Sequence, residues 1–119
     1  MSYVISIYHA DIKKKIDGGL AIEDFEHSRF EEEDLARFLI RLIKYGYRPE
    51  SEHTSMKAYV KEVDACPIQV HVFDTQISFS VPYWPNSKEA IFAALQDASE
   101  LSDSNTMVMH DAQNNEWIL

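Results

Sequence analysis

Two alternating segments on either side of Asp74-Thr75 constrain the fold of this chain more than any other feature. In Ile68-Gln-Val-His-Val-Phe73 and in Gln76-Ile-Ser-Phe-Ser-Val81, apolar and polar side chains alternate with a period of two. Such alternation is typical of strands with one buried face. The sequence therefore predicts a β-hairpin, and we expect one register because a slip of one residue would expose a whole apolar set.

The expected register pairs Val72 with Ile77 and Val70 with Phe79, so that apolar residues meet apolar residues. A connecting loop of two or of four residues is compatible with this register, and Asp-Thr is a poor choice for a tight type I′ turn. Pro82 has no backbone donor, so we expect it to end the second strand or to lie at an edge.

The remaining elements follow from periodicity and capping signals. Ser28-Arg-Phe-Glu31 has capping-box spacing and predicts the start of a helix that stops at Gly46. Residues 47–54 are predicted as a turn and connection, and residues 11–27 as a short helical turn followed by a loop. Residues 56–63 also suit a helix, but their place before the hairpin favours a strand. Further strands are expected at 3–8, 106–110 and 116–119, and a second helix at 88–101.

The resulting order, β-α-β-β-β-α-β-β, predicts an α+β fold. We expect a largely antiparallel sheet with two main helices packed on one face, because most strands are adjacent in sequence. With 119 residues, the chain is long enough for one domain over 1–119 with its own hydrophobic core.

The charge distribution restricts the kinds of partner. The net charge is −9, and seven carboxylates lie between Glu23 and Asp34 against one arginine. Nucleic-acid binding needs a basic surface, so we expect no nucleic-acid partner, whereas a basic protein fits. Helix capping and solubility are the ordinary explanation of such a cluster. The candidate interaction residues within it are Glu31, Glu32, Glu33 and Asp34.

Cysteine usage and hydropathy indicate a protein kept in the cytoplasm. The single cysteine, Cys66, can form no internal disulfide, and we interpret it as a small core residue. No apolar run approaches the roughly 20 residues that span a bilayer, and the N-terminal residues lack the pattern of a secretory signal.

Histidines are the main candidates for chemistry. His9, His71 and His110 are each near a carboxylate in sequence, and neighbouring strands would allow a metal site. No dense ligand motif, nucleophile elbow or phosphate-binding loop occurs. We therefore expect no catalytic residue, metal or cofactor. His71 is then a polar-face residue opposite Ser78, and the sequence favours a non-enzymatic protein.

Phe79-Ser-Val-Pro-Tyr-Trp84 is followed by a predicted helix and by Met109-His-Asp-Ala-Gln113. This arrangement resembles small uncharacterised bacterial α+β proteins in which an F-S-x-P-Y-W segment precedes a helix and a D-x-Q turn. The resemblance implies a fold and no activity. Tyr83 and Trp84, held between two prolines, are candidate interaction residues, because rigid amphipathic aromatics are common at interfaces. Packing over the core edge is their ordinary explanation.

Together these features predict a protein-interaction module, of which an immunity-type inhibitor of a basic partner is one form. A small-molecule or metal-dependent enzyme using His9, His71 and His110 is the first alternative. A homodimer joined through an exposed strand edge is the second.

Overall fold

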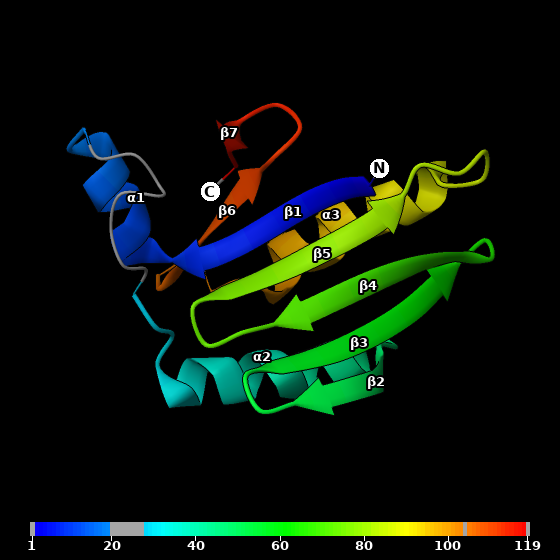
Figure 1. The fold of residues 1–119 in the computed structure, drawn as a ribbon, viewed down its shortest axis with the longest axis horizontal. Coiled ribbons are helices and arrows are strands. Elements are labelled where there is room, and N and C mark those ends of the chain that lie inside the picture. The colour runs from blue at the N-terminus through cyan, green and yellow to red at the C-terminus, as the bar shows by residue number, and fades with distance from the viewer. Residues whose placement is uncertain (1, 20–27, 104, 119) are drawn as a thin grey trace.

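The fold is described by a computed structural model that covers residues 2–19, 28–103 and 105–118. Within these residues, seven strands form one antiparallel sheet in the order β2-β3-β4-β5-β1-β6-β7 (Figure 1). Three helices accompany the sheet, and the α+β class is confirmed. The elements are β1 (Ser2–His9), α1 (Ala10–Asp17), α2 (Glu32–Lys44), β2 (Arg48–His53), β3 (Met56–Val63), β4 (Cys66–Val72), β5 (Gln76–Pro82), α3 (Lys88–Leu101), β6 (Met107–Asp111) and β7 (Glu116–Trp117).

The hairpin predicted around Asp74-Thr75 is β4 and β5, and its register is confirmed. Val72 pairs with Ile77 and Val70 with Phe79. The backbone N–H of Phe73 donates to the carbonyl of Gln76 at 2.8 Å, which leaves a loop of two residues. The apolar residues of both strands are almost fully buried, so this face of the hairpin belongs to the core.

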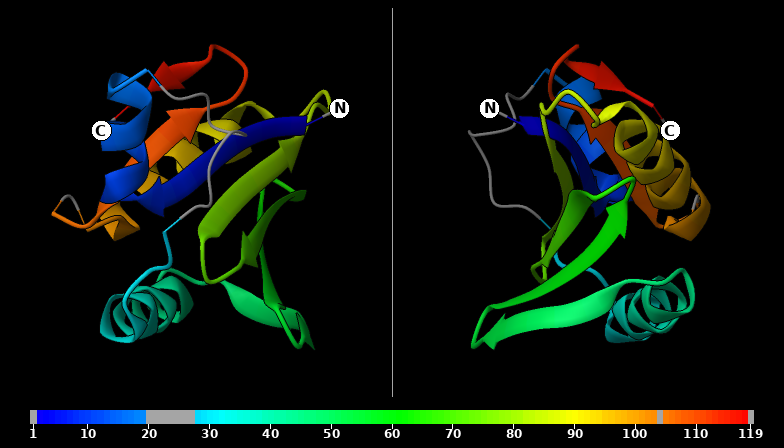
Figure 2. Two further views of the ribbon diagram at one scale, coloured as in Figure 1. Left: turned by 60° about the vertical axis from the view of Figure 1, so that its left-hand side comes forward. Right: turned by 90° about the vertical axis from the view of Figure 1, so that its right-hand side faces the viewer.

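Helices α2 and α3 lie on the same side of the sheet (Figure 2). Phe38 and Leu42 of α2 and Ala94 and Leu101 of α3 pack in one cluster with the apolar face of β1, β4 and β5. On the opposite side, Ile12 of α1 forms a smaller buried cluster at the β1–β6 corner. The prediction of two main helices on one face is therefore confirmed, with α1 as an addition.

Two elements differ from the predictions. The segment predicted as a turn and connection, 47–54, contains β2, an exposed edge strand that pairs with β3. The strand over 56–63 is confirmed as β3. Helix α1 is longer than the predicted helical turn, and the predicted loop that follows lies outside the described residues from position 20 to position 27.

The predicted capping box at Ser28 is wrong. Helix α2 begins at Glu32, and its N-cap residue Glu31 makes no capping hydrogen bond through its side chain. The helix starts later than predicted because of Phe30, the residue before the N-cap. The N–H of Phe30 donates to the carbonyl of Asp74 at 2.8 Å. This bond ties the chain to the β4–β5 turn, so the helix starts only after it.

Candidate functional site

The face of the sheet opposite α2 and α3 is the candidate site, and we call it the open face. Two rows of side chains cross its centre, because residues paired across antiparallel strands project to the same side. The first row is Ala58, His71, Ser78, Ser6 and His110, and the second is Val60, Gln69, Ser80 and Val4.

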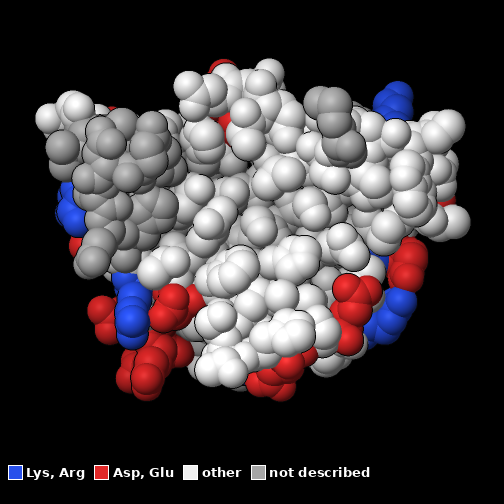
Figure 3. All heavy atoms as spheres, in the orientation of Figure 1, with Lys and Arg blue, Asp and Glu red and all other residues white. Residues whose placement is uncertain are grey.

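Neither row contains a lysine, arginine, aspartate or glutamate. Figure 3 shows the same feature as a broad uncharged surface, with acidic and basic side chains along its border. Most of these side chains are half-buried, whereas Ser6, Ala58 and Val60 are buried. Among the described residues of a chain with 26% charged residues, the two central rows of this face thus carry no charge.

Hydroxyl, amide and imidazole groups give the open face hydrogen-bonding capacity without formal charge. Within the face, Gln76 Nε2 donates to Ser6 Oγ at 3.1 Å. Removing such neutral groups from water costs less free energy than removing ionised ones. Depletion of charge at the centre, inside a polar border, is one compositional feature of protein–protein interfaces.

The charged border includes residues of β2, of β3 and of the start of α2. At one corner of the face, Arg48 and Glu62 form a double ion pair, with both N–O distances at 2.6 Å. At the end bounded by the β4–β5 turn, the α2 start follows the contact between Phe30 and Asp74. Glu31, Glu32 and Glu33 are exposed there, and no ion pair engages them within the described residues.

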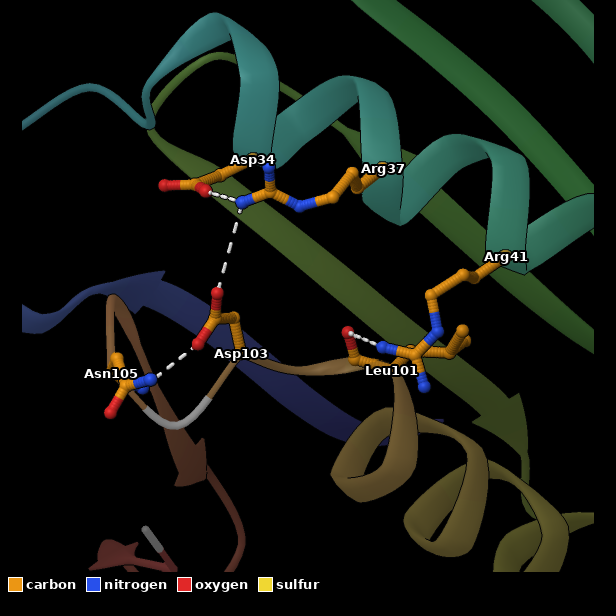
Figure 4. A network of polar contacts seen from close by, with 6 residues as sticks. All are labelled: Asp34, Arg37, Arg41, Leu101, Asp103 and Asn105. Atoms are coloured by element: carbon orange, nitrogen blue, oxygen red, sulfur yellow. Dashed lines mark hydrogen bonds and ion pairs between the residues drawn. The ribbon is translucent and has the colours of Figure 1, made fainter.

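Asp34 is different from its three neighbours and is explained by the fold. It is buried and accepts a hydrogen bond from Arg37, whose guanidinium also lies 3.9 Å from Asp103 (Figure 4). Arg41 donates to the carbonyls of Glu100 and Leu101 at the end of α3. These contacts connect α2 to the end of α3. Asp34 contributes to them because it binds the guanidinium of Arg37, which lies close to Asp103.

The two groups of predicted interaction residues lie far apart. Tyr83 and Trp84 are each 48% exposed and follow the last residue of β5, whereas the α2 start lies beside the turn before β5. Seven strand residues separate these ends, which is about 20 Å. Tyr83 also packs edge-on against Tyr3, with ring centroids 6.5 Å apart. The two groups therefore lie at opposite ends of β5.

The three histidines do not meet. His71 and His110 share one row, but β5 and β1 lie between them, which separates them by about 14 Å. His9 lies at the start of α1, where its Nδ1 accepts from the N–H of Asp11 at 3.1 Å. His71 faces Ser78 as predicted. Among the described residues, no group of three histidine, cysteine or acidic side chains could hold a metal ion.

A buried polar cluster behind the sheet was not predicted. Asp97 of α3 accepts from the hydroxyl of Tyr47 at 2.8 Å and from Lys61 Nζ at 2.6 Å. Lys61 Nζ also lies 4.7 Å from the Tyr47 ring centroid. Burial, with the hydrogen bond to Asp97 and its charge, raises the pKa of Tyr47 well above its ordinary value. The cluster joins α3 to β3, and its residues are too far apart in sequence to give a local signal.

Asp111 organises the turn between β6 and β7. It is buried and accepts hydrogen bonds from Tyr3, Gln113 and Asn114. Burial acts to raise the pKa of Asp111, but the hydrogen bonds from Asn114, Tyr3 and Gln113 outweigh it and hold the pKa below its ordinary value. Every acceptor atom of this carboxylate is thus used within the fold, which gives the residue a structural role.

Cys66 is fully buried and is a free thiol. Burial raises the pKa of this thiol, which keeps it protonated and unreactive. The interpretation of Cys66 as a small core residue is confirmed.

No helix in the described ranges combines the length and the apolar character needed to cross a membrane. Searches against models of protein families, against curated proteins and against solved structures found no match to this chain.

Proposed function

We propose that this chain is a non-enzymatic protein-interaction module that binds a basic protein on the open face of its sheet. The observation that carries the proposal is the absence of charge from the two central rows, inside a charged border, on a chain with a net charge of −9. An immunity-type inhibitor of a basic protein is one function of this kind.

The negative net charge supports a basic partner through the rate of association. Opposite charges speed the encounter of two proteins, and this effect weakens as salt screens them. The carboxylates Glu31, Glu32 and Glu33 form no ion pair within the described part of the chain. They stand at one end of the open face, where they contribute to this attraction. The uncharged centre then makes the close contact, since little desolvation of ionised groups opposes it.

The enzyme alternative finds little support in the geometry. His9, His71 and His110 share no hydrogen bond among the described residues. His110 is occupied by its contacts with Trp117 and Asn115.

Affinity capture from extract of the cells that make this protein tests the proposal. The wild-type chain should retain a basic protein at low salt and release it at high salt. Ser80→Arg places a positive charge in the centre of the open face and should abolish retention. Gln96→Arg adds the same charge on the exposed surface of α3, on the other side of the sheet, and should preserve it.

Circular dichroism of both variants verifies that they are folded. Failure to retain any basic protein at low salt contradicts the proposed function. Equal retention by Ser80→Arg and Gln96→Arg contradicts the assignment of the open face.

A further inference from the structure

The outer surface of α2 carries an apolar stripe that the core does not use. Ile40 is 59% exposed and Ile43 is 47% exposed, and Ala36 is exposed on the same stripe. Residues at i, i+4 and i+7 share one side of a helix. Phe38 and Leu42, on the inward side, are buried. Helix α2 therefore has two apolar sides, one packed on the sheet and one facing outward.

Opposite charges flank the two ends of this stripe. Glu33 is exposed in the first turn and Lys44 is exposed at the last residue. At 100° per residue, both lie on the same flank of the stripe. Neither forms an ion pair within the described residues, whereas Arg37 and Arg41 are engaged with Asp103 and with α3 carbonyls. The charges available to a partner are thus negative at the start and positive at the end.

This distribution is complementary to itself in one orientation. When two copies of α2 lie antiparallel, the acidic start of each meets the basic end of the other, and two-fold symmetry makes the contact twice. The same flank of each helix then comes together, which places Glu33 of one copy beside Lys44 of the second. A parallel pair would bring like charges together instead.

We propose that this chain forms a two-fold symmetric dimer through the outer side of α2, with the two helices antiparallel and Ile40 near the axis. Ile40 then packs on Ile40 of the second copy, and Ile43 packs on Ala36. Burial of both isoleucines supplies the hydrophobic driving force, and the Glu33–Lys44 pairs fix the orientation.

The edges of the sheet are less suited to self-association. The outer edge, β2, carries Pro49, charged side chains and a register shift between Pro49 and Ser51. The other edge, β7, is two residues long. Proline, charge, irregularity and short length all discourage strand pairing between molecules. The apolar part of the dimer interface lies on the other side of the sheet from the open face. Glu33, at the start of α2, is the one residue that the dimer shares with the border of the open face.

Disulfide trapping tests the position of Ile40. Ile40→Cys should form a disulfide-linked dimer under mild oxidation, because residues on a two-fold axis meet their own copies. Phe92→Cys is the matched control, since Phe92 is also 59% exposed but lies on α3, and it should remain largely monomeric. The native Cys66 is buried and does not interfere. Equal linking of both variants, or none of Ile40→Cys, overturns the proposal.

The antiparallel orientation of the two helices is tested by exchanging the charges of Glu33 and Lys44 and measuring the molecular mass by light scattering. The wild-type chain should have twice the mass of the 13.8 kDa chain. Ile40→Asp, Glu33→Lys and Lys44→Glu should each shift the mass toward that of the monomer. The double exchange Glu33→Lys with Lys44→Glu should restore the dimer. A wild-type mass of 13.8 kDa at every concentration, or no restoration, overturns the proposal, while binding of a basic protein to the open face is measured independently.

Discussion

Phe79 shows how one residue connects the layers of this fold. Its side chain is 1% exposed and contacts Phe38 of α2 and Tyr47, both edge-on, with centroid distances of 6.4 Å and 5.9 Å. Phe79→Ala removes these contacts and leaves a cavity, so we expect the free energy of unfolding to fall by about 3 to 5 kcal/mol. Urea denaturation measures this change, and a loss below about 1 kcal/mol is incompatible with the assigned core face.

Asp97 is the residue on which the buried polar cluster depends. Asp97→Ala would leave Lys61 and Tyr47 without their common acceptor. Because an unpaired charge in a mostly buried site is costly, we expect a loss of about 3 kcal/mol. Glu62→Gln is the control, since it breaks the exposed pair with Arg48 and should leave the free energy of unfolding close to the wild-type value. Equal effects of the two substitutions, measured by urea denaturation, would contradict the role of the cluster.

At the scale of the elements, the β3–β4 turn is a point of backbone strain. Asp64 and Ala65 both have positive φ, at 53° and 63°, as a type I′ turn requires. Residues with a Cβ are disfavoured there, so Ala65→Gly should stabilise the protein by about 0.5 to 1 kcal/mol. Ala58→Gly, within β3, should instead destabilise it. A midpoint of urea unfolding that falls for Ala65→Gly contradicts this account.

A hydrogen bond from the Tyr3 hydroxyl to Asp111 joins the start of β1 to the end of β6, and the hydroxyl loses its proton at high pH. Burial, with the hydrogen bond to Asp111 and its charge, raises the pKa of Tyr3 to about 12, from 10.0. Between these values the unfolded chain loses its proton and the folded chain keeps it, so stability falls as the pH rises. Tyr3→Phe should therefore lose less stability between pH 10 and pH 12 than the wild-type protein. Urea denaturation at several pH values measures the difference, and parallel profiles would contradict it.

Local patterns in the sequence predict most of the elements, and they fail where a distant contact decides the outcome. The hairpin register can be predicted from the alternation of apolar and polar residues, because the apolar face, the polar face and the turn length are all compatible with the same strand pairing. Strand β2 was missed because all its residues are exposed and Arg48-Pro49-Glu50 has no apolar period. The start of α2 was misplaced because the bond from Phe30 to Asp74 spans a distance in sequence that no capping pattern encodes.

In the candidate site too, local features can be predicted from the sequence and features that depend on distant contacts cannot. The uncharged character of residues 69, 71, 78 and 80 is visible in the sequence, but the strand order that aligns them with Ser6 and Ala58 is not. The carboxylates of the α2 start could be predicted as exposed, with Asp34 as the exception. Its burial depends on Arg37, and through Arg37 on the position of Asp103 at the end of another helix.

At the scale of the whole molecule, net charge sets the response to salt. With a net charge of −9, repulsion between the carboxylates opposes the compact state. Salt at about 0.1 M largely screens the repulsion between exposed charges that are more than about 10 Å apart. We expect the midpoint of urea unfolding to rise when sodium chloride increases from about 20 to about 200 mM. A falling midpoint would show that the ion pairs outweigh the repulsion.

The place of β1 in the sheet determines when this protein can complete its fold during synthesis. Its neighbours are β5, where Ile5 meets Phe79, and β6, where Ile5 meets Asp111. The ribosome makes β1 before either of them, so Ile5 and Ile7 have no strand partner until most of the chain has emerged. The meander from β2 to β5 contains only adjacent pairings and can assemble earlier. Insertion of β1 between β5 and β6 is then a late step of folding, during which Ile5 and Ile7 still lack their strand partners.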